Sequence, residues 1–242
     1  MMHYLLEMLK GSISWLIGKL GYTRLQEGAS LSFSQCGEDL IVSHIFKLRG
    51  IPNPSYIDIG AHHPFLLSNT ALFYHHGSRG VNIEANPQLI EAFKIHRPND
   101  INLNIGIGPS KTKLDFFVME DATLSTFSAR EMENMISQGR RVANKISVEM
   151  HSIQYILEKH CDNVFPDFLN IDVEGLDYEI VQTIDFEKSY PKVICIEAVE
   201  YSSRGNGKRR DDLINFILSK GYTEYANTNL NAIMVKNEFW SN

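Results

Sequence analysis

Short apolar runs alternate with helix-like patterns along most of this chain, and this order restricts the fold more than any other feature. The runs "YIDI", "VNI" and "FLNI" are rich in Ile and Val, and each is followed at once by Gly, Glu or Asp. Strands that alternate with helices form a mainly parallel sheet covered by helices on both faces. Two strand patterns after the last helix predict an antiparallel edge. We therefore predict an α/β fold with a doubly wound, mainly parallel sheet.

The predicted elements follow from these runs and from the helix-end signals between them. Strands are predicted at residues 55–60, 80–85, 101–108, 113–119, 145–150, 167–173, 192–199, 222–228 and 231–237. Helices are predicted at residues 34–50, 68–77, 86–97, 128–145, 151–160, 175–184 and 211–221. The third helix has the clearest start, because Asn86 is a good N-cap and Pro87 suits the first helical position. The polar segment 128–145 is either a mobile lid or an ordinary surface helix.

Length and composition favour one large domain over two small ones. The 242 residues are 43% hydrophobic and 21% charged, which is enough to bury a full core. A net charge of −6 argues against a general nucleic-acid binder. We expect the basic run Lys208-Arg209-Arg210 to lie in a solvated loop. The three cysteines are scattered and form no zinc or disulfide pattern, so we expect a reducing, cytoplasmic compartment.

The N-terminus carries a separate amphipathic pattern. Its apolar residues at helical spacing are Leu5, Leu9, Ile13, Leu16 and Leu20. The uninterrupted apolar runs are too short for a membrane span or a signal peptide. We predict a helical extension at residues 1–30 and a large domain at residues 31–242. We expect the extension to pack on its own domain or on a second subunit, as in a homodimer, rather than to lie on a membrane.

The turn after the first predicted strand has the frame of a dinucleotide site without a place for phosphates. Asp58 and Gly60 end the first strand, and Glu84 ends the second, where an acidic side chain can accept both hydroxyl groups of a ribose. The residues after Gly60 are "AHHPF", too bulky for the backbone to close on two phosphates. The residues that can bind a carboxylate at the next helix start are Ser68, Asn69 and Thr70. These partners fit S-adenosylmethionine, although an ordinary strand–helix turn gives the same pattern.

Four motifs in this order resemble those of FkbM-family methyltransferases. They are "FSQCGEDLI" at 33–41, "YIDIGAHHPFLLSNT" at 56–70, "VNIEANP" at 81–87 and "FLNIDVEGLDYEIV" at 168–181. The resemblance runs from Phe33 to the last strand. It implies that residues 31–242 form a class I S-adenosylmethionine-dependent methyltransferase domain with a Rossmann-like, seven-stranded sheet. Methylation of a hydroxyl group on a sugar or natural product is the activity that it implies.

The resemblance also implies which residues bind the cofactor. The positions that match the cofactor motifs are Gln35, Glu38, Asp39, Asp58, Gly60, Glu84, Ala85, Asn86, Ile105, Gly106 and Asp172. Among them, Glu84 would bind the ribose, and Asn86 and residues 105–106 would lie near the adenine. His62 and His63 stand where many relatives have smaller or acidic residues, so we expect structural or hydrogen-bonding roles for them.

Three acidic residues are the candidates for the chemistry. Asp172 and Glu197 end two predicted strands, and Glu174 follows Asp172 by two positions. Three converging carboxylates require positive charge or a proton, and a sulfonium donor supplies part of that charge. Either a carboxylate or a histidine acts as general base toward the acceptor hydroxyl, or the three carboxylates hold Mg²⁺. A structural role for each acid, as a helix cap or a partner of Arg, also stays open.

Three functions compete for this chain. An O-methyltransferase acting on a carbohydrate or a carbohydrate-containing natural product, such as a surface polysaccharide unit, explains the turn, Glu84 and the acids. An NAD-dependent sugar-modifying oxidoreductase or epimerase explains Glu84 but not the turn, and we expect the chain to lack its Tyr-x-x-x-Lys-type pair. A non-catalytic binding module on the same fold does not explain the presence of Asp58, Gly60, Glu84 and Asp172 together. We predict the first, with a sugar or glycan acceptor, no nucleic acid and no stable membrane insertion.

Overall fold

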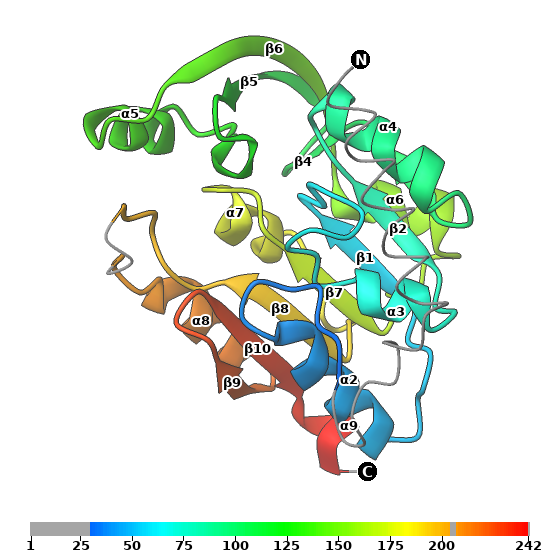
Figure 1. Ribbon diagram of the computed structural model, residues 1–242. Helices are drawn as coiled ribbons and strands as arrows, with labels where there is room; N and C mark the ends of the chain where they lie inside the picture. Colours follow the sequence, from blue (N-terminus) through cyan, green and yellow to red (C-terminus); the bar gives the residue numbers. More distant parts are fainter. Residues whose placement is uncertain (1–29, 204–206, 242) are drawn as a thin grey trace. The chain divides into compact units, whose positions relative to one another are not determined.

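Seven strands form the large sheet, in the order β3-β2-β1-β7-β8-β10-β9 (Figure 1). The computed structural model describes residues 30–203 and 207–241, so the predicted N-terminal helix lies outside the described residues. The strands are β1 Tyr56–Ile59, β2 Gly80–Ile83, β3 Ile101–Leu103, β7 Phe168–Ile171, β8 Val193–Glu197, β9 Tyr222–Asn227 and β10 Asn231–Lys236. The first five in chain order are parallel, and β10 is antiparallel to both β8 and β9. The predicted α/β fold with an antiparallel edge is confirmed.

Helices cover both faces of this sheet. They are α2 Glu38–Leu48, α3 Ala71–His75, α4 Pro87–His96, α6 Ile153–His160, α7 Asp177–Gln182, α8 Asp211–Ser219 and α9 Asn237–Ser241. Because side chains alternate along a strand, Ile57 and Ile59 pack with α6, α7 and α8, while Tyr56 packs with α2 and α3. The chain divides into two units, 1–32 and 33–242, and this fold is that of the second unit.

A second, smaller sheet was not predicted. Its strands are β4 Gly106–Ile107, β5 Thr112–Met119 and β6 Val142–His151, in the order β4-β6-β5. The prediction of one strand at 101–108 is therefore wrong, since this run divides between β3 and β4. Asn104 holds the bend, because its side-chain amide donates to the carbonyl oxygens of Glu84 and Ala85 at 2.9 and 3.0 Å.

The predicted helix at 128–145 is also too long. The α5 helix, Ala129–Ser137, ends because Gly139 adopts φ +86° and the N–H of Arg140 donates back to the Met135 carbonyl, a common helix ending. From Val142 onward the chain pairs with β5 instead. Figure 1 shows β6 arching from the region of α5 toward α4. The short 3₁₀ helix η1, Ala122–Leu124, connects β5 to this region.

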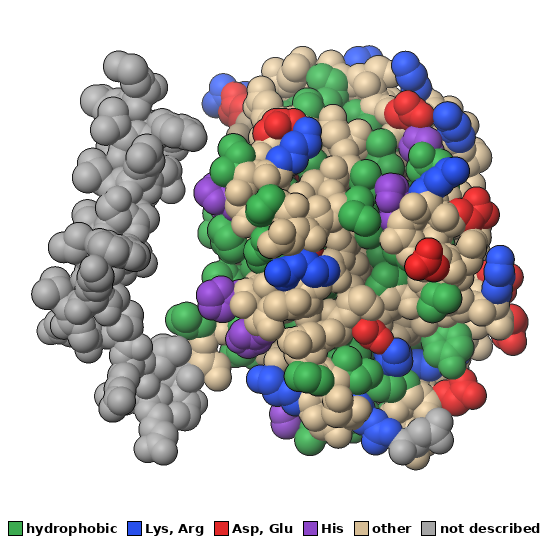
Figure 2. Space-filling model, turned by 90° about the vertical axis from the view of Figure 1, so that its right-hand side faces the viewer, with side chains coloured by type: hydrophobic (Ala, Val, Ile, Leu, Met, Phe, Trp, Pro, Cys, Tyr) green, Lys and Arg blue, Asp and Glu red, His purple; other side chains and the backbone are tan. Residues whose placement is uncertain are grey.

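Charges of both signs share the face of the molecule that Figure 2 shows. Lys and Arg side chains lie among Asp and Glu there, with apolar side chains scattered between them. Within residues 30–203 and 207–241, no helix has the length and apolar character needed to cross a membrane.

Candidate functional site

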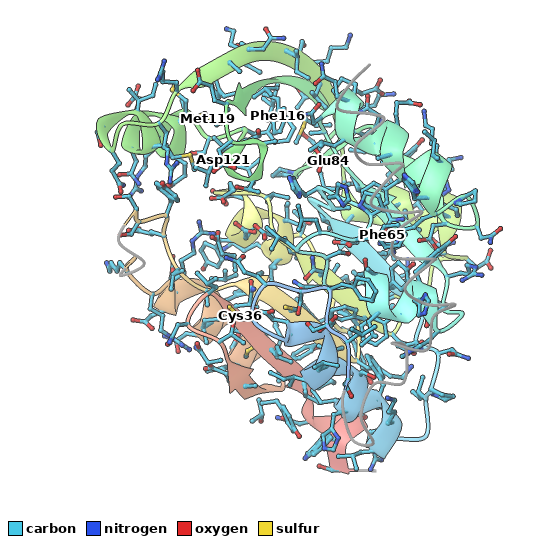
Figure 3. The ribbon with its side chains drawn as sticks, viewed as in Figure 1. Cys36, Phe65, Glu84, Phe116, Met119 and Asp121 are labelled. Carbon is cyan, nitrogen blue, oxygen red and sulfur yellow. The ribbon has the colours of Figure 1, made fainter. Side chains whose placement is uncertain are left out.

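A pocket of about 480 Å³ opens at the carboxyl ends of β1 and β7, where the strand order reverses. Its wall also includes residues of the small sheet and of η1, and Figure 3 shows Glu84 and Phe116 near one another on this side. The predicted site residues in the wall are Gln35, Asp58, Gly60, Ser68, Asn69, Glu84, Ala85, Ile105, Gly106, Asp172, Glu174 and Glu197. The predicted residues that do not line it are Glu38, Asp39, Thr70 and Asn86.

Gly60 allows the ends of β1 and β7 to come together. It has φ +80°, and a Cβ atom at this position would lie 1.8 Å from the carbonyl oxygen of Asp172. The N–H of Asp172 donates to the carbonyl of Ile59 at 2.9 Å, and the N–H of Gly60 donates to the carbonyl of Ile83 at 2.9 Å. The turn therefore brings Asp172 close to the ends of β1 and β2, as its predicted position requires.

Asp58 belongs to a buried polar network beneath the pocket. Its carboxylate accepts from the Thr70 hydroxyl at 2.5 Å and from the Asn170 amide at 2.8 Å. The guanidinium of Arg97, fully buried, donates to the Thr70 hydroxyl oxygen and to Asp100. Burial raises the pKa of Asp58, while Thr70 and the charge of Arg97 oppose this rise. Thr70 thus supports Asp58, and the buried guanidinium of Arg97 stabilises both. The sequence does not single out Arg97, apart from its position before a proline.

Glu84 presents its carboxylate at the edge of the pocket. One oxygen accepts from the backbone N–H of His62 at 2.9 Å, and the other accepts from the N–H of Asn86 at 2.7 Å. Each carboxylate oxygen can accept a further hydrogen bond. Burial raises the pKa of Glu84 to about 7. The Asn86 side chain caps α4 by accepting from the N–H of Gln88, so it supports Glu84 rather than lining the pocket.

The two histidines of the turn differ in their surroundings. His63 accepts from the N–H groups of Phe65 and Leu66 through Nδ1, at 3.1 and 2.9 Å, and so fixes the loop. His62 lines the pocket with φ +53°, and burial lowers the pKa of its imidazole.

The segment "SNT" offers fewer free donors than predicted. The hydroxyl of Ser68 already accepts from the N–H groups of Thr70 and Ala71, at 3.4 and 3.2 Å. The amide of Asn69 donates to the Asn170 side chain at 2.9 Å. A carboxylate bound here would contact the side chains of Ser68 and Asn69 rather than free backbone N–H groups.

Glu38 and Asp39 hold the segment that carries Gln35. Glu38 is fully buried and accepts from the Thr228 hydroxyl at 2.8 Å and the Asn231 amide at 2.9 Å. Asp39 accepts from the N–H of Phe33 at 2.7 Å. Both acids therefore position the pocket wall from outside it.

The carboxylates of Asp172, Glu174 and Glu197 converge as predicted. One oxygen of each lies within 4.8 Å of the others. Glu174 has a left-handed backbone, φ +52°, and the Asp177 carboxylate fixes this turn by accepting from the N–H groups of Val173 and Gly175, both at 3.2 Å. The Asp172 side chain is open to the pocket, but loss of solvent to the surrounding protein, followed by the charge of Asp177, raises its pKa to about 7. Burial and the neighbouring acids raise the pKa of Glu174 and Glu197 well above the usual range.

Arg210 lies in this site, which corrects the prediction of a solvated basic loop. Its guanidinium is 2.6 Å from Asp177 and 3.3 Å from Glu197, and its side chain is 13% exposed. The chain returns to the end of β8 because the N–H of Arg210 donates to the carbonyl of Ala198, and Val199 pairs with Arg209. This long-range pairing leaves no local sequence signal.

Residues 199–203 connect the large sheet to the end of α5. Arg140 donates to the Tyr201 hydroxyl at 2.7 Å, and the N–H of Ser203 donates to the Gln138 side chain at 2.8 Å. Tyr201, Glu200 and η1 all line the pocket, so these contacts join its wall to the end of α5.

Comparison with known proteins places these features in a family. The family described as "Methyltransferase FkbM domain" matches residues 58–224. The methyltransferase FkbM from Methylobacillus flagellatus has 14% sequence identity and a TM-score of 0.44; the alignment covers 76% of this chain and 43% of that protein. A TehB-like SAM-dependent methyltransferase from Corynebacterium glutamicum has 10% identity and a TM-score of 0.41, with 93% and 99% covered. The sequence has no significant match among curated proteins. Because the family match extends over more than half of the chain, the chain belongs to the FkbM methyltransferase family.

Proposed function

We propose that this protein transfers a methyl group from S-adenosylmethionine to a hydroxyl oxygen of a carbohydrate or a carbohydrate-containing natural product. The observation that carries the proposal is one continuous pocket that joins Glu84 to the acids Asp172, Glu174 and Glu197. A diol-binding carboxylate and a cluster of acids in the same cavity suit a nucleoside donor and a polar acceptor.

The pocket fits the donor without a phosphate site. Glu84 has lone pairs for the two ribose hydroxyls, and Ile83, Ile105 and Ile107 supply an apolar wall suited to adenine. Ser68 and Asn69 suit the polar amino-acid end of the donor, with Asp172 facing the same cavity.

The acids would deal with the proton of the acceptor. Bound S-adenosylmethionine supplies an electrophilic methyl group on a sulfonium sulfur. The acceptor hydroxyl oxygen would form the new C–O bond as the C–S bond of the donor breaks, and one of the three carboxylates would accept its proton. Asp172, Glu174 and Glu197 are also the residues that would hold a divalent cation, which would lower the pKa of the acceptor hydroxyl. Alignment of the acceptor by Asp172, Glu174 and Glu197 would provide much of the rate.

The oxidoreductase alternative has less support. A Tyr-x-x-x-Lys pair, of the kind used by many sugar oxidoreductases, does occur as Tyr155 and Lys159. However, it lies on α6, outside the pocket wall, and Tyr155 stacks on His151. We also propose a reducing, cytoplasmic setting, because the three cysteines are scattered along the sequence without a disulfide or zinc pattern.

Calorimetry with three ligands tests the proposal. We expect S-adenosylmethionine and its demethylated product to bind the full chain in the micromolar range, and NAD to give no saturable heat. Preferential binding of NAD would favour the oxidoreductase. Binding of neither ligand class would favour a non-catalytic module.

A further inference from the structure

The three carboxylates at the ends of β7 and β8 are short of positive charge. Asp172 follows β7, Glu174 lies in the next turn, and Glu197 ends β8. We call these three carboxylates the trio. Among the described residues, one basic side chain forms an ion pair with the trio: Arg210, at 3.3 Å from Glu197. The same guanidinium is closer to Asp177, at 2.6 Å. One guanidinium shared in this way cannot neutralise the cluster.

Two of the carboxylates also have oxygens without a hydrogen-bond partner. The Oε2 atoms of Glu174 and Glu197 are buried and accept no hydrogen bond from the described residues, although Arg210 lies near the second. Glu174 is 8% exposed. A buried carboxylate oxygen without a partner is costly, so the Oε2 atom of Glu174, with which Arg210 forms no ion pair, requires a ligand or a proton.

The backbone conformation of Glu174 is strained, and neighbouring residues stabilise it. Its left-handed φ of +52° costs energy in a residue with a side chain, and such strain persists when its surroundings enforce it. The Asp177 carboxylate accepts from the N–H groups of the two residues that flank Glu174. The Thr126 hydroxyl donates to the Glu174 carbonyl at 2.5 Å. The fold thus directs a buried carboxylate toward the other two.

We propose that Asp172, Glu174 and Glu197 bind one divalent cation, Mg²⁺ or Mn²⁺. All three ligands are hard oxygen donors, as these ions prefer. Their separation of at most 4.8 Å is slightly wider than the roughly 4.2 Å between opposite ligands of an octahedral Mg²⁺ ion. Asp172 is exposed to the pocket, so an approach of its carboxylate by less than about 1 Å would close this gap. The use of the cation to bind the acceptor hydroxyl rests on the proposed function, but its binding does not.

Cation binding can be measured without cofactor or acceptor. The metal-free full chain is titrated with MnCl₂, with free Mn²⁺ followed by electron paramagnetic resonance and competition by MgCl₂. We expect one site per chain, and Glu174→Gln and Glu197→Gln should each weaken it at least about ten-fold. Glu200→Gln is the matched control, because this pocket acid lies outside the trio, and it should leave the affinity within about two-fold.

The outcomes separate this inference from the proposed function. Absence of saturable Mn²⁺ binding by the wild-type chain would overturn the site, as would equal affinity in both trio variants. Thermal melts show whether Glu174→Gln and Glu197→Gln fold. If one of them does not fold, the Mn²⁺ affinity of the other still tests the site. A chain that binds Mn²⁺ but not S-adenosylmethionine would keep the cation site and remove the proposed function. A chain that binds S-adenosylmethionine in EDTA but has no Mn²⁺ site would keep the proposed function and remove the cation site.

Discussion

At the scale of single residues, two positions decide how the pocket is built. Glu84 receives backbone N–H groups from both sides and faces the cavity, and Gly60 allows two strand ends to touch. Both residues were predicted from the sequence because their roles depend on strand ends, which short apolar runs mark well. Glu38 and Asp39 were placed less well. The partner of Glu38, Asn231, is far away in the sequence, and Asp39 instead binds the nearby backbone N–H of Phe33.

The affinity for S-adenosylmethionine should rise with pH around neutrality. Burial raises the pKa of Glu84 to about 7, and ribose hydroxyls donate better to the ionised carboxylate. In the wild-type protein, binding should therefore weaken as the pH falls from about 8 to about 6. Glu84→Gln should remove this pH dependence and should weaken binding by about 1.5–3 kcal/mol at the higher pH. Calorimetry across this range checks both effects. Glu91→Gln, an exposed acid on α4, should behave as wild type, and a Glu84→Gln curve identical to wild type would show that the ribose binds elsewhere.

Gly60→Ala should destabilise the fold more than Gly50→Ala. Both glycines have positive φ, but a Cβ at Gly60 meets the Asp172 carbonyl oxygen at 1.8 Å, whereas a Cβ at Gly50 has nothing within 4 Å. We expect Gly50→Ala to cost about 1 kcal/mol of unfolding free energy and Gly60→Ala at least about 2 kcal/mol more. Denaturant titration gives both values. Equal losses would mean that β1 and β7 can separate at little cost.

At the scale of elements, the large sheet was predictable and the small sheet was not. Buried parallel strands appear in the sequence as apolar runs, but β6 is mostly exposed over its first half and β4 has two residues. The end of α5 depends on the left-handed backbone of Gly139, and the polar pattern of segment 128–145 did not reveal this helix end. Arg97 and Arg210 reach the site from helix ends, and their burial depends on partners far away in the sequence.

The Arg97 network should be a main support of the α4 end and the first turn. Removing one member of a buried ion pair leaves its partner unpaired, so Arg97→Met should lower the free energy of unfolding by about 3–5 kcal/mol. Lys94→Met, which breaks an exposed pair on the same helix, should cost no more than about 1 kcal/mol. Chemical denaturation compares the two. Similar small losses in both variants would show that Asp100 and Asp58 do not depend on Arg97.

At the scale of the whole molecule, the N-terminal extension stays a prediction from sequence. Its apolar stripe is narrow and interrupted by charges, which favours packing on protein over a membrane. Deletion of residues 1–25 should change the oligomeric state or the solubility, as measured by light scattering after gel filtration. Sedimentation of the intact chain, but not the truncated one, with liposomes would instead support a membrane-surface role.

The central claim is that the acids at the ends of β7 and β8 act on an acceptor hydroxyl beside a bound methyl donor. Its most direct test is transfer of labelled methyl groups from S-adenosylmethionine to a carbohydrate acceptor, such as a nucleotide-linked sugar, by wild type and Asp172→Asn. We expect cofactor affinity to stay within a few-fold and turnover to fall by at least about 10² in the variant. Full turnover by Asp172→Asn on the same acceptor would contradict the account and return Asp172 to a structural role.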